Sequence, residues 1–101
     1  MPELMNYVSR MRALIRREFQ MLPDGLIDLY TLLALTCGNS VNMKDVHDAW
    51  AVWCNDHQPG HRSLIPFGDL TREVQELDRK YMDGIRRAVE EYHAEMLRDR
   101  L

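Results

Sequence analysis

The chain has 101 residues, of which 46% are apolar and 29% charged, and its formal net charge is −3. These values are typical of one globular domain with a single core, and they exclude a disordered chain. Acids and bases alternate along the sequence and no apolar run reaches the roughly 18 residues of a membrane span, so we expect neither nucleic acid nor a membrane as partner.

The first predicted element is an amphipathic helix over residues 3–22. Its apolar residues recur at three- and four-residue steps; they are Leu4, Val8, Met11, Leu14, Ile15, Phe19 and Leu22. Pro2 stands near the start, where a helix tolerates proline. The outward face carries Arg10, Arg12, Arg16 and Arg17. Because Glu3 and Glu18 dilute this positive charge, we interpret the face as solvated and not as a phosphate-binding surface.

The second predicted helix, "LIDLYTLLALT", follows the break "LPDG" and is apolar on nearly all sides. We expect it to be central, with Asp24 as its N-cap. Gly38 stands where a left-handed C-cap residue belongs. Asn42 is then expected to cap the third helix, and Asp45, three residues later, completes a capping-box pattern.

The third predicted helix spans residues 43–56. Its stripe is Met43, Val46, His47, Trp50, Trp53, Cys54 and His57. Tryptophans three residues apart on an apolar stripe are more often core than a platform for a flat ligand. Pro59, Gly60 and Pro66 are incompatible with a continued helix and end it.

A long last helix is predicted from residue 70 or 71 to Arg98, capped by Thr71 or Asp69. Its stripe is Val74, Leu77, Tyr81, Ile85, Ala88, Val89, Tyr92 and Met96. Gly84 inside it costs about 1 kcal/mol relative to alanine. The last turns carry few core candidates, so we expect them to fray or to pair with another chain, and a homodimer stays open. The prediction is therefore an all-α, single compact domain over residues 1–101 with about four helices.

Cys54, His57 and His61 carry thiolate and imidazole groups, which are suitable zinc ligands. His47, the fourth candidate, lies about 10 Å from Cys54 along the helix at 1.5 Å per residue, too far to share one ion. We therefore predict no metal and no cofactor. The two cysteines cannot define a disulfide framework and are expected to remain thiols. Without a secretory signal at the amino terminus, we expect a cytoplasmic protein.

Catalysis and DNA binding are also weakly supported. The serines lack a nucleophile elbow, and the five glycines form no phosphate-cradling loop. The second and third helices could form a helix-turn-helix motif, but Asp45, Asp48 and Asp56 would face the DNA with Lys44 almost alone against them. We predict a non-catalytic protein.

The best candidate for a binding site is the loop over residues 57–70. It combines an apolar run with a rigid Pro66 and a polar rim, and loops carry function more often than cores do. We expect any ligand pocket to lie between this loop and the third helix.

Three segments, "VHDAW", "LIPFGDL" and "LDRKYMDGI", together resemble the RyR domain, a small helical module repeated in ryanodine receptors and found alone in bacteria and phages. The matching positions are His47, Trp50, Leu64, Ile65, Pro66, Phe67, Leu70, Asp78 and Arg79. The resemblance covers residues 45–85, and "NDHQPGHR" replaces the Gly-Trp-x-x-Gly segment that is common in that family. Over its full length the chain also resembles small uncharacterised proteins of actinobacteria and their phages.

The RyR resemblance implies a non-catalytic binding module, with nucleotide-like molecules as ligands in some members. Stacking could then come from Trp50 or Phe67, and a phosphate contact from Arg62 or Arg79, with His61 on the rim. Our leading hypothesis is an interaction module for a protein partner, either phage-encoded or regulatory. The alternative is a sensor of a small nucleotide-like ligand.

Overall fold

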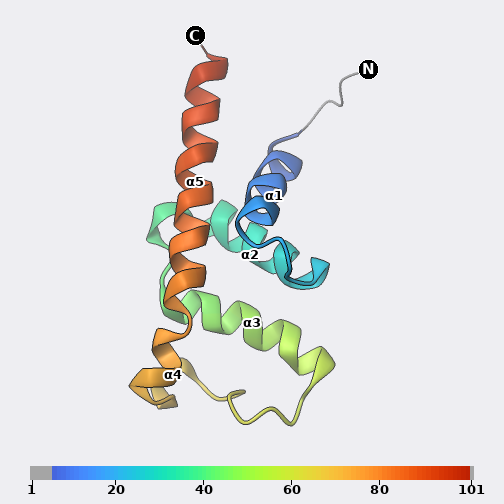
Figure 1. The fold of residues 1–101 in the computed structure, drawn as a ribbon, viewed down its shortest axis with the longest axis vertical. Helices are drawn as coiled ribbons and strands as arrows, with labels where there is room; N and C mark the ends of the chain where they lie inside the picture. Colours follow the sequence, from blue (N-terminus) through green and yellow to red (C-terminus); the bar gives the residue numbers. More distant parts are fainter. Residues whose placement is uncertain (1–5, 101) are drawn as a thin grey trace.

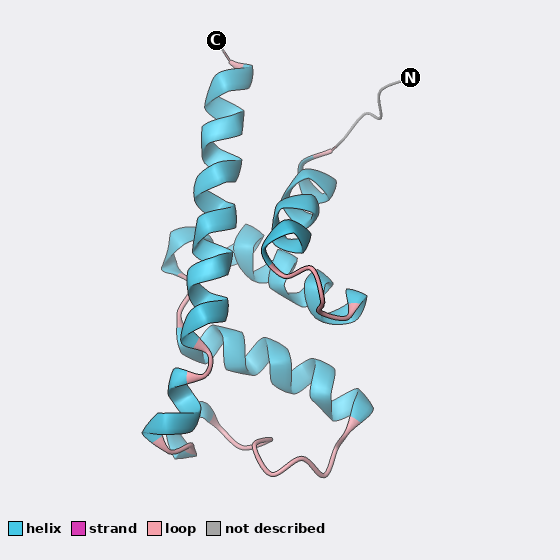
Figure 2. Ribbon diagram, in the orientation of Figure 1, coloured by secondary structure: helices cyan, strands magenta, loops and turns pink. Residues whose placement is uncertain are grey.

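The computed structural model describes residues 6–100, and every regular element in that range is helical (Figure 2). The α-helices are α1 (Tyr7–Glu18), α2 (Asp24–Cys37), α3 (Met43–His57), α4 (Arg72–Glu76) and α5 (Arg79–Asp99), and two short 3₁₀ turns are η1 (Gly38–Ser40) and η2 (Phe67–Asp69). The prediction of an all-α domain with a long C-terminal helix is confirmed, α5 alone having 21 residues.

The long helix α5 organises the molecule (Figure 1). Helix α1 runs antiparallel to it and packs along its C-terminal half, while α2 packs on α1, α3 and α5. Helix α3 crosses near the start of α5, and the chain then loops back through α4 to enter α5 from below (Figure 1). One end of the domain is therefore made up of α3, the loop after it and α4 (Figure 1).

One core joins the four longer helices. The buried apolar side chains are Met11, Leu14 and Ile15 from α1, Leu26, Ile27, Tyr30 and Ala34 from α2, Val41, Val46 and Ala49 from η1 to α3, and Met82, Ile85, Ala88 and Val89 from α5. As predicted, α2 is central, since it contacts three other helices. Trp50 and Trp53 are only partly buried against this core.

Helix α1 is shorter than predicted. It begins at Tyr7, where the Asn6 side chain accepts a hydrogen bond from the Ser9 amide, and it ends at Glu18. The predicted start at residues 3–5, with the proposed roles of Pro2 and Leu4, lies outside the described residues. The end is early because Phe19 leaves helical geometry and the chain turns toward Pro23, which disfavours helix in the residue before it.

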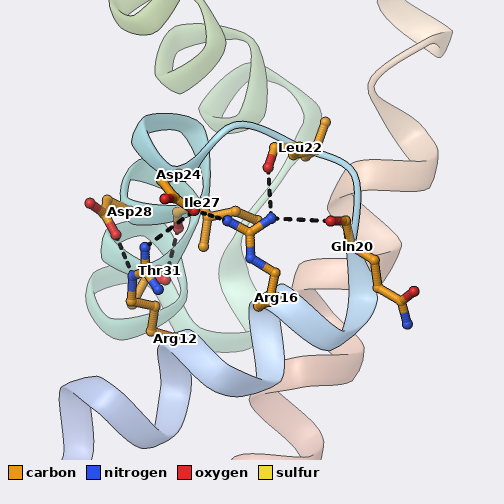
Figure 3. A network of polar contacts seen from close by, with 8 residues as sticks. All are labelled: Arg12, Arg16, Gln20, Leu22, Asp24, Ile27, Asp28 and Thr31. Carbon is orange, nitrogen blue, oxygen red and sulfur yellow. Dashed lines mark hydrogen bonds and ion pairs between the residues drawn. The ribbon is translucent and has the colours of Figure 1, made fainter.

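Arginines of α1 stabilise that turn, and here the predicted solvated face is wrong in part. Arg16 donates to the carbonyl oxygen of Leu22 over 2.7 Å and pairs with Asp24, while Arg12 binds Asp28 over 2.6 Å (Figure 3). Asp24 was expected to cap α2; instead Pro23 is the N-cap and the Asp24 carboxylate turns to the arginines. These ion pairs tie α1 to the start of α2.

The other predicted end positions are confirmed, although Gly38 does not adopt the predicted left-handed helical geometry. Gly38 terminates α2 with φ of +57°, a backbone region that favours glycine, although its ψ of −138° is not that of a left-handed helix. Asn42 and Asp45 form a complete capping box at α3. Thr71 caps α4 by accepting the Val74 amide.

The predicted last helix is divided in two. The amides of Leu77 and Asp78 bond to carbonyls three residues back, so the chain tightens into a 3₁₀-type turn between α4 and α5. Leu77 was expected in the core stripe but is 66% exposed at this turn. The far end of α5 was expected to fray or to pair with another chain. The helix continues to Asp99, whose carboxylate accepts from Arg10 over 2.7 Å, and pairing with another chain stays a prediction.

Within residues 6–100, no helix combines the length and the apolar character needed to cross a membrane.

Candidate functional site

A cleft of about 430 Å³ opens at the end of the domain where α3, its following loop and the α4–α5 turn meet the start of α2. Its lining residues are Leu22, Pro23, Leu26 and Tyr30 near α2, His47, Trp50 and Trp53 on α3, His61 and Ser63 in the loop, and Val74, Leu77, Asp78, Lys80 and Tyr81 at the turn. The walls are mainly apolar and aromatic, with a few polar groups, which is the usual character of a ligand site.

The aromatic wall comes from α3, whose helical period places three ring side chains on the side facing the cleft. His47, Trp50 and Trp53 stand at three-residue steps, so they share that face. Val46 and Ala49, beside them, face the core and are buried. The tryptophans were expected in the core, and the structure gives them both roles, since each packs on the core with one part and lines the cleft with another.

A buried histidine attaches the loop to α3. The Nε2 atom of His47 lies 2.8 Å from the carbonyl oxygen of Ile65, so this nitrogen carries the proton and donates. His61 Nδ1 accepts from the Ser63 amide over 3.0 Å, and its ring meets Trp50 edge to face with centroids 5.0 Å apart. The loop is therefore held in place on the side of the cleft.

Two tyrosines form the opposite wall. Tyr30 is only 2% exposed, and Tyr81 lies 6.1 Å from it between ring centroids. Phe19 contacts both rings at 5.6 Å. Burial raises the pKa of the Tyr30 hydroxyl, and Tyr81 and then the charge of Asp78 add to the effect. The hydroxyl is therefore protonated at all ordinary pH values.

Asp78 supplies the negative charge of the cleft. It occupies the N-cap position of α5, yet its side chain makes no capping hydrogen bond. Burial raises the pKa of its carboxyl, and the nearby His47 offsets part of that rise. Lys80, the cation of the cleft, is exposed and places its Nζ 5.0 Å from the centre of the Tyr81 ring.

The structure brings together two of the five predicted site residues. Trp50 and His61 line the cleft, as the expectation of a pocket between loop and third helix requires. Phe67 packs against His47, with ring centroids 6.0 Å apart, and does not line the cleft. Arg62 is exposed and Arg79 pairs with Glu76 over 2.8 Å, and neither lines the cleft.

Sequence reasoning missed the contribution of α2 and of the α4–α5 turn. The sequence pattern places Tyr30 on a helix that is apolar on nearly all sides and Tyr81 in the core stripe of the last helix. Asp78 was singled out only through the RyR resemblance, and Lys80 not at all. The available signal was two charged residues, Asp78 and Lys80, beside the apolar stripe at the point where the helix breaks. The break itself was not predicted, because no proline or glycine stands there.

The candidate metal ligands do not converge. Among residues 6–100, no three histidine, cysteine or acidic side chains are grouped so that they could hold an ion. The His57 ring stacks on Trp53 and its Nδ1 lies 2.8 Å from the Trp53 carbonyl oxygen. Cys54 is buried and Cys37 partly buried, and the two are free thiols.

Comparison with known families assigns the chain to one of them. Residues 6–90 match the family described as Domain of unknown function (DUF7701), so the protein belongs to this family. The match includes every element that lines the cleft. No curated protein and no solved structure matches the chain.

Proposed function

We propose that this domain is a non-catalytic binding module for a protein partner, and that the cleft receives a side chain of that partner. The observation that carries the proposal is the combination of a concave aromatic cleft with exposed apolar side chains at its edge. A protein partner needs both, since hot-spot side chains fill pockets and the surrounding surface excludes water.

The edge residues support a macromolecule rather than a small ligand alone. Leu77 lines the cleft and is 66% exposed, and Met21 is 94% exposed next to the cleft residue Leu22. A second, shallower hollow contains Met21 and shares Leu22, Lys80 and Tyr81 with the cleft. The apolar surface therefore continues beyond the cleft, and clustered exposed apolar groups mark interaction sites.

The absence of a recognised catalytic constellation in the sequence makes binding the more economical function. The RyR resemblance, which stays a prediction, implies the same class of module. A regulatory or phage-encoded role and a cytoplasmic location belong to this proposal as well, and the partner rather than the domain would define the pathway.

A sensor of a nucleotide-like ligand is the alternative function. The aromatic wall with Trp50 favours it, because bases stack on such rings. The phosphate contact would come from Lys80, since Arg62 and Arg79 do not line the cleft. This function needs no exposed apolar edge, and on that ground we favour the protein partner.

The test is affinity capture with a filled cleft. Ser63→Trp places a large ring at the cleft wall, whereas Gly60→Trp changes the same loop at a position with open space around it. We expect the captured partner to be lost from Ser63→Trp and retained by Gly60→Trp and the parent protein. Equal recovery by all three would overturn the proposal, and circular dichroism of each variant checks that the fold is intact.

A further inference from the structure

We propose that the group received by the cleft is an alkylammonium, the side-chain terminus of a lysine on the partner, bound between the Asp78 carboxylate and the aromatic walls. This inference rests on the proposed function and names the chemistry of that same site.

The first support is the carboxylate itself. Asp78 is partly buried and lines the cleft, and among residues 6–100 it has neither an ion pair nor a hydrogen bond to its side chain. Of the other partly buried acids in residues 6–100, Glu18 pairs with Arg87 and Glu91 with Arg98, while Asp83, which lies outside the cleft, is unpaired like Asp78. A partly desolvated carboxylate without a partner gains most from a cation that enters the cleft.

The second support is an independent polar group, the hydroxyl of Tyr30. All fully enclosed side-chain nitrogen and oxygen atoms in the described part of the chain have hydrogen-bond partners, yet none of those bonds involves this hydroxyl. The oxygen therefore keeps some accessible surface although the residue is only 2% exposed, and Tyr30 is one of the residues that line the cleft. An ammonium has three donors, and this oxygen accepts one of them.

The third support is the arrangement of rings. Trp50, Trp53, Tyr30 and Tyr81 all line the cleft, and their faces carry the negative charge that attracts a cation. The protein itself shows this attraction, because Lys80 lays its ammonium 5.0 Å from the centre of the Tyr81 ring. A partner lysine would bring a long apolar stem for the apolar wall and a charged head for Asp78.

Charge around the cleft is compatible with a cationic guest. Besides Asp78, the titratable groups that line it are His47, His61, Lys80 and the two tyrosines. Lys80 is the one fixed positive charge among them, and it stands exposed at the edge, where water screens it. The chain as a whole carries a net charge of −3, which favours the approach of a basic partner.

Lys80 also has a consequence for affinity. Its ammonium occupies one ring face in the empty protein, so it competes with a guest and repels it. Lys80→Gln removes this competitor and is expected to strengthen binding, whereas removal of the Asp78 charge weakens it. An anion site would give the reverse, with weaker binding in Lys80→Gln and stronger binding once the Asp78 charge is removed.

In the experiment, the purified protein is titrated with Nα-acetyl-lysine amide, whose side-chain ammonium is free. Amide and indole resonances are followed by NMR. N-acetyl-norleucine amide, which has nearly the same shape and no charge, is the matched probe. We expect saturable shifts from the lysine probe at Trp50, Trp53 and residues 77–81, and about tenfold weaker binding by the norleucine probe.

Two variants complete the design. Asp78→Asn keeps the shape and is expected to abolish the preference for lysine, while Asp83→Asn on the next turn of α5, outside the cleft, retains it. Equal binding of both probes, or an unchanged preference in Asp78→Asn, would overturn the inference. If the filled-cleft variant still loses the partner in that case, the proposed function stands and only the lysine assignment fails.

Discussion

The ring of Phe19 occupies the space in which a side chain at position 84 would begin. A β-carbon at position 84 would overlap Phe19 Cζ and would lie 2.8 Å from Cε1. The glycine therefore permits the loop after α1 to place Phe19 on α5, and from there the ring supports Tyr30 and Tyr81 in the wall of the cleft.

The first prediction concerns this contact. Gly84→Ala should destabilise the protein by about 1–3 kcal/mol through overpacking, even though alanine is intrinsically better in a helix by about 1 kcal/mol. Urea unfolding measures the change. Gly68→Ala, at a position with open space, is the control and should stay within about 0.5 kcal/mol of the parent. A Gly84→Ala variant as stable as the parent would show that the ring moves aside freely.

A second prediction concerns the turn between α1 and α2. Arg16→Gln removes donors to the carbonyl oxygens of Gln20 and Leu22 and the ion pair with Asp24, and should cost about 1–2 kcal/mol. Arg17→Gln, one residue along on the exposed side, should cost less than about 0.5 kcal/mol. Equal unfolding midpoints in urea for the two variants would show that the network of Figure 3 adds no stability.

The sequence predicted the frame better than the details that shape the cleft. Apolar periodicity located α2 and α3 and identified most of the buried residues of α5, because burial of one helix face is what that periodicity encodes. The end of α1 was misplaced because Phe19 and Leu22 continue the apolar period after the helix has ended. The Arg16 contacts to the following turn and the space that Gly84 leaves for Phe19 stabilise this turn. Neither contact is expressed in the apolar period, and the second depends on a residue distant in the sequence.

Only part of the candidate site could be predicted from the sequence, for the same reason. Trp50 lies on α3 and His61 in the loop that follows it, so one continuous segment of sequence contains both. Tyr30, Asp78 and Lys80 reach the cleft through packing between helices, which no local pattern describes. Arg62 and Arg79 were suggested as phosphate contacts through the RyR resemblance and their charge, and neither of these indicates the direction of a side chain.

A third prediction follows from the raised pKa of Asp78. A carboxyl whose pKa is higher in the folded than in the unfolded chain costs stability when ionised, and costs nothing once both states are protonated, below its ordinary value of 3.8. Asp78→Asn should therefore unfold at a higher urea concentration than the parent at pH 7, and the difference should shrink as the pH falls toward 3.

The control for that prediction is Asp83→Asn, which should show no such gain at pH 7. Loss of stability in Asp78→Asn at pH 7 would contradict it, and would indicate that the carboxylate has a structural partner. A residue that lowers stability and lines a cleft is expected where that residue is needed for binding.

A fourth prediction concerns the attachment of the loop. His47→Phe keeps a ring at this buried position but leaves the carbonyl oxygen of Ile65 without its donor, at a cost of about 1–3 kcal/mol. Amide hydrogen exchange should become faster in residues 61–65. In the core of α5 near Ile85, exchange should accelerate only as far as the lower free energy of global unfolding requires. His57→Phe, on the exposed end of the same helix, is the matched control. Unchanged loop exchange in His47→Phe would contradict the prediction.

The most direct test of the central claim is photo-cross-linking from single positions around the cleft. Benzoylphenylalanine placed at Met21 or Leu77 lies at the cleft edge, and the same residue at Leu32 or Leu97 is exposed elsewhere. We predict that one partner protein is cross-linked from the first two positions and not from the other two, and that Ser63→Trp abolishes the product. A partner that cross-links equally from Leu32 and Leu97, or whose cross-link survives a filled cleft, would contradict the account.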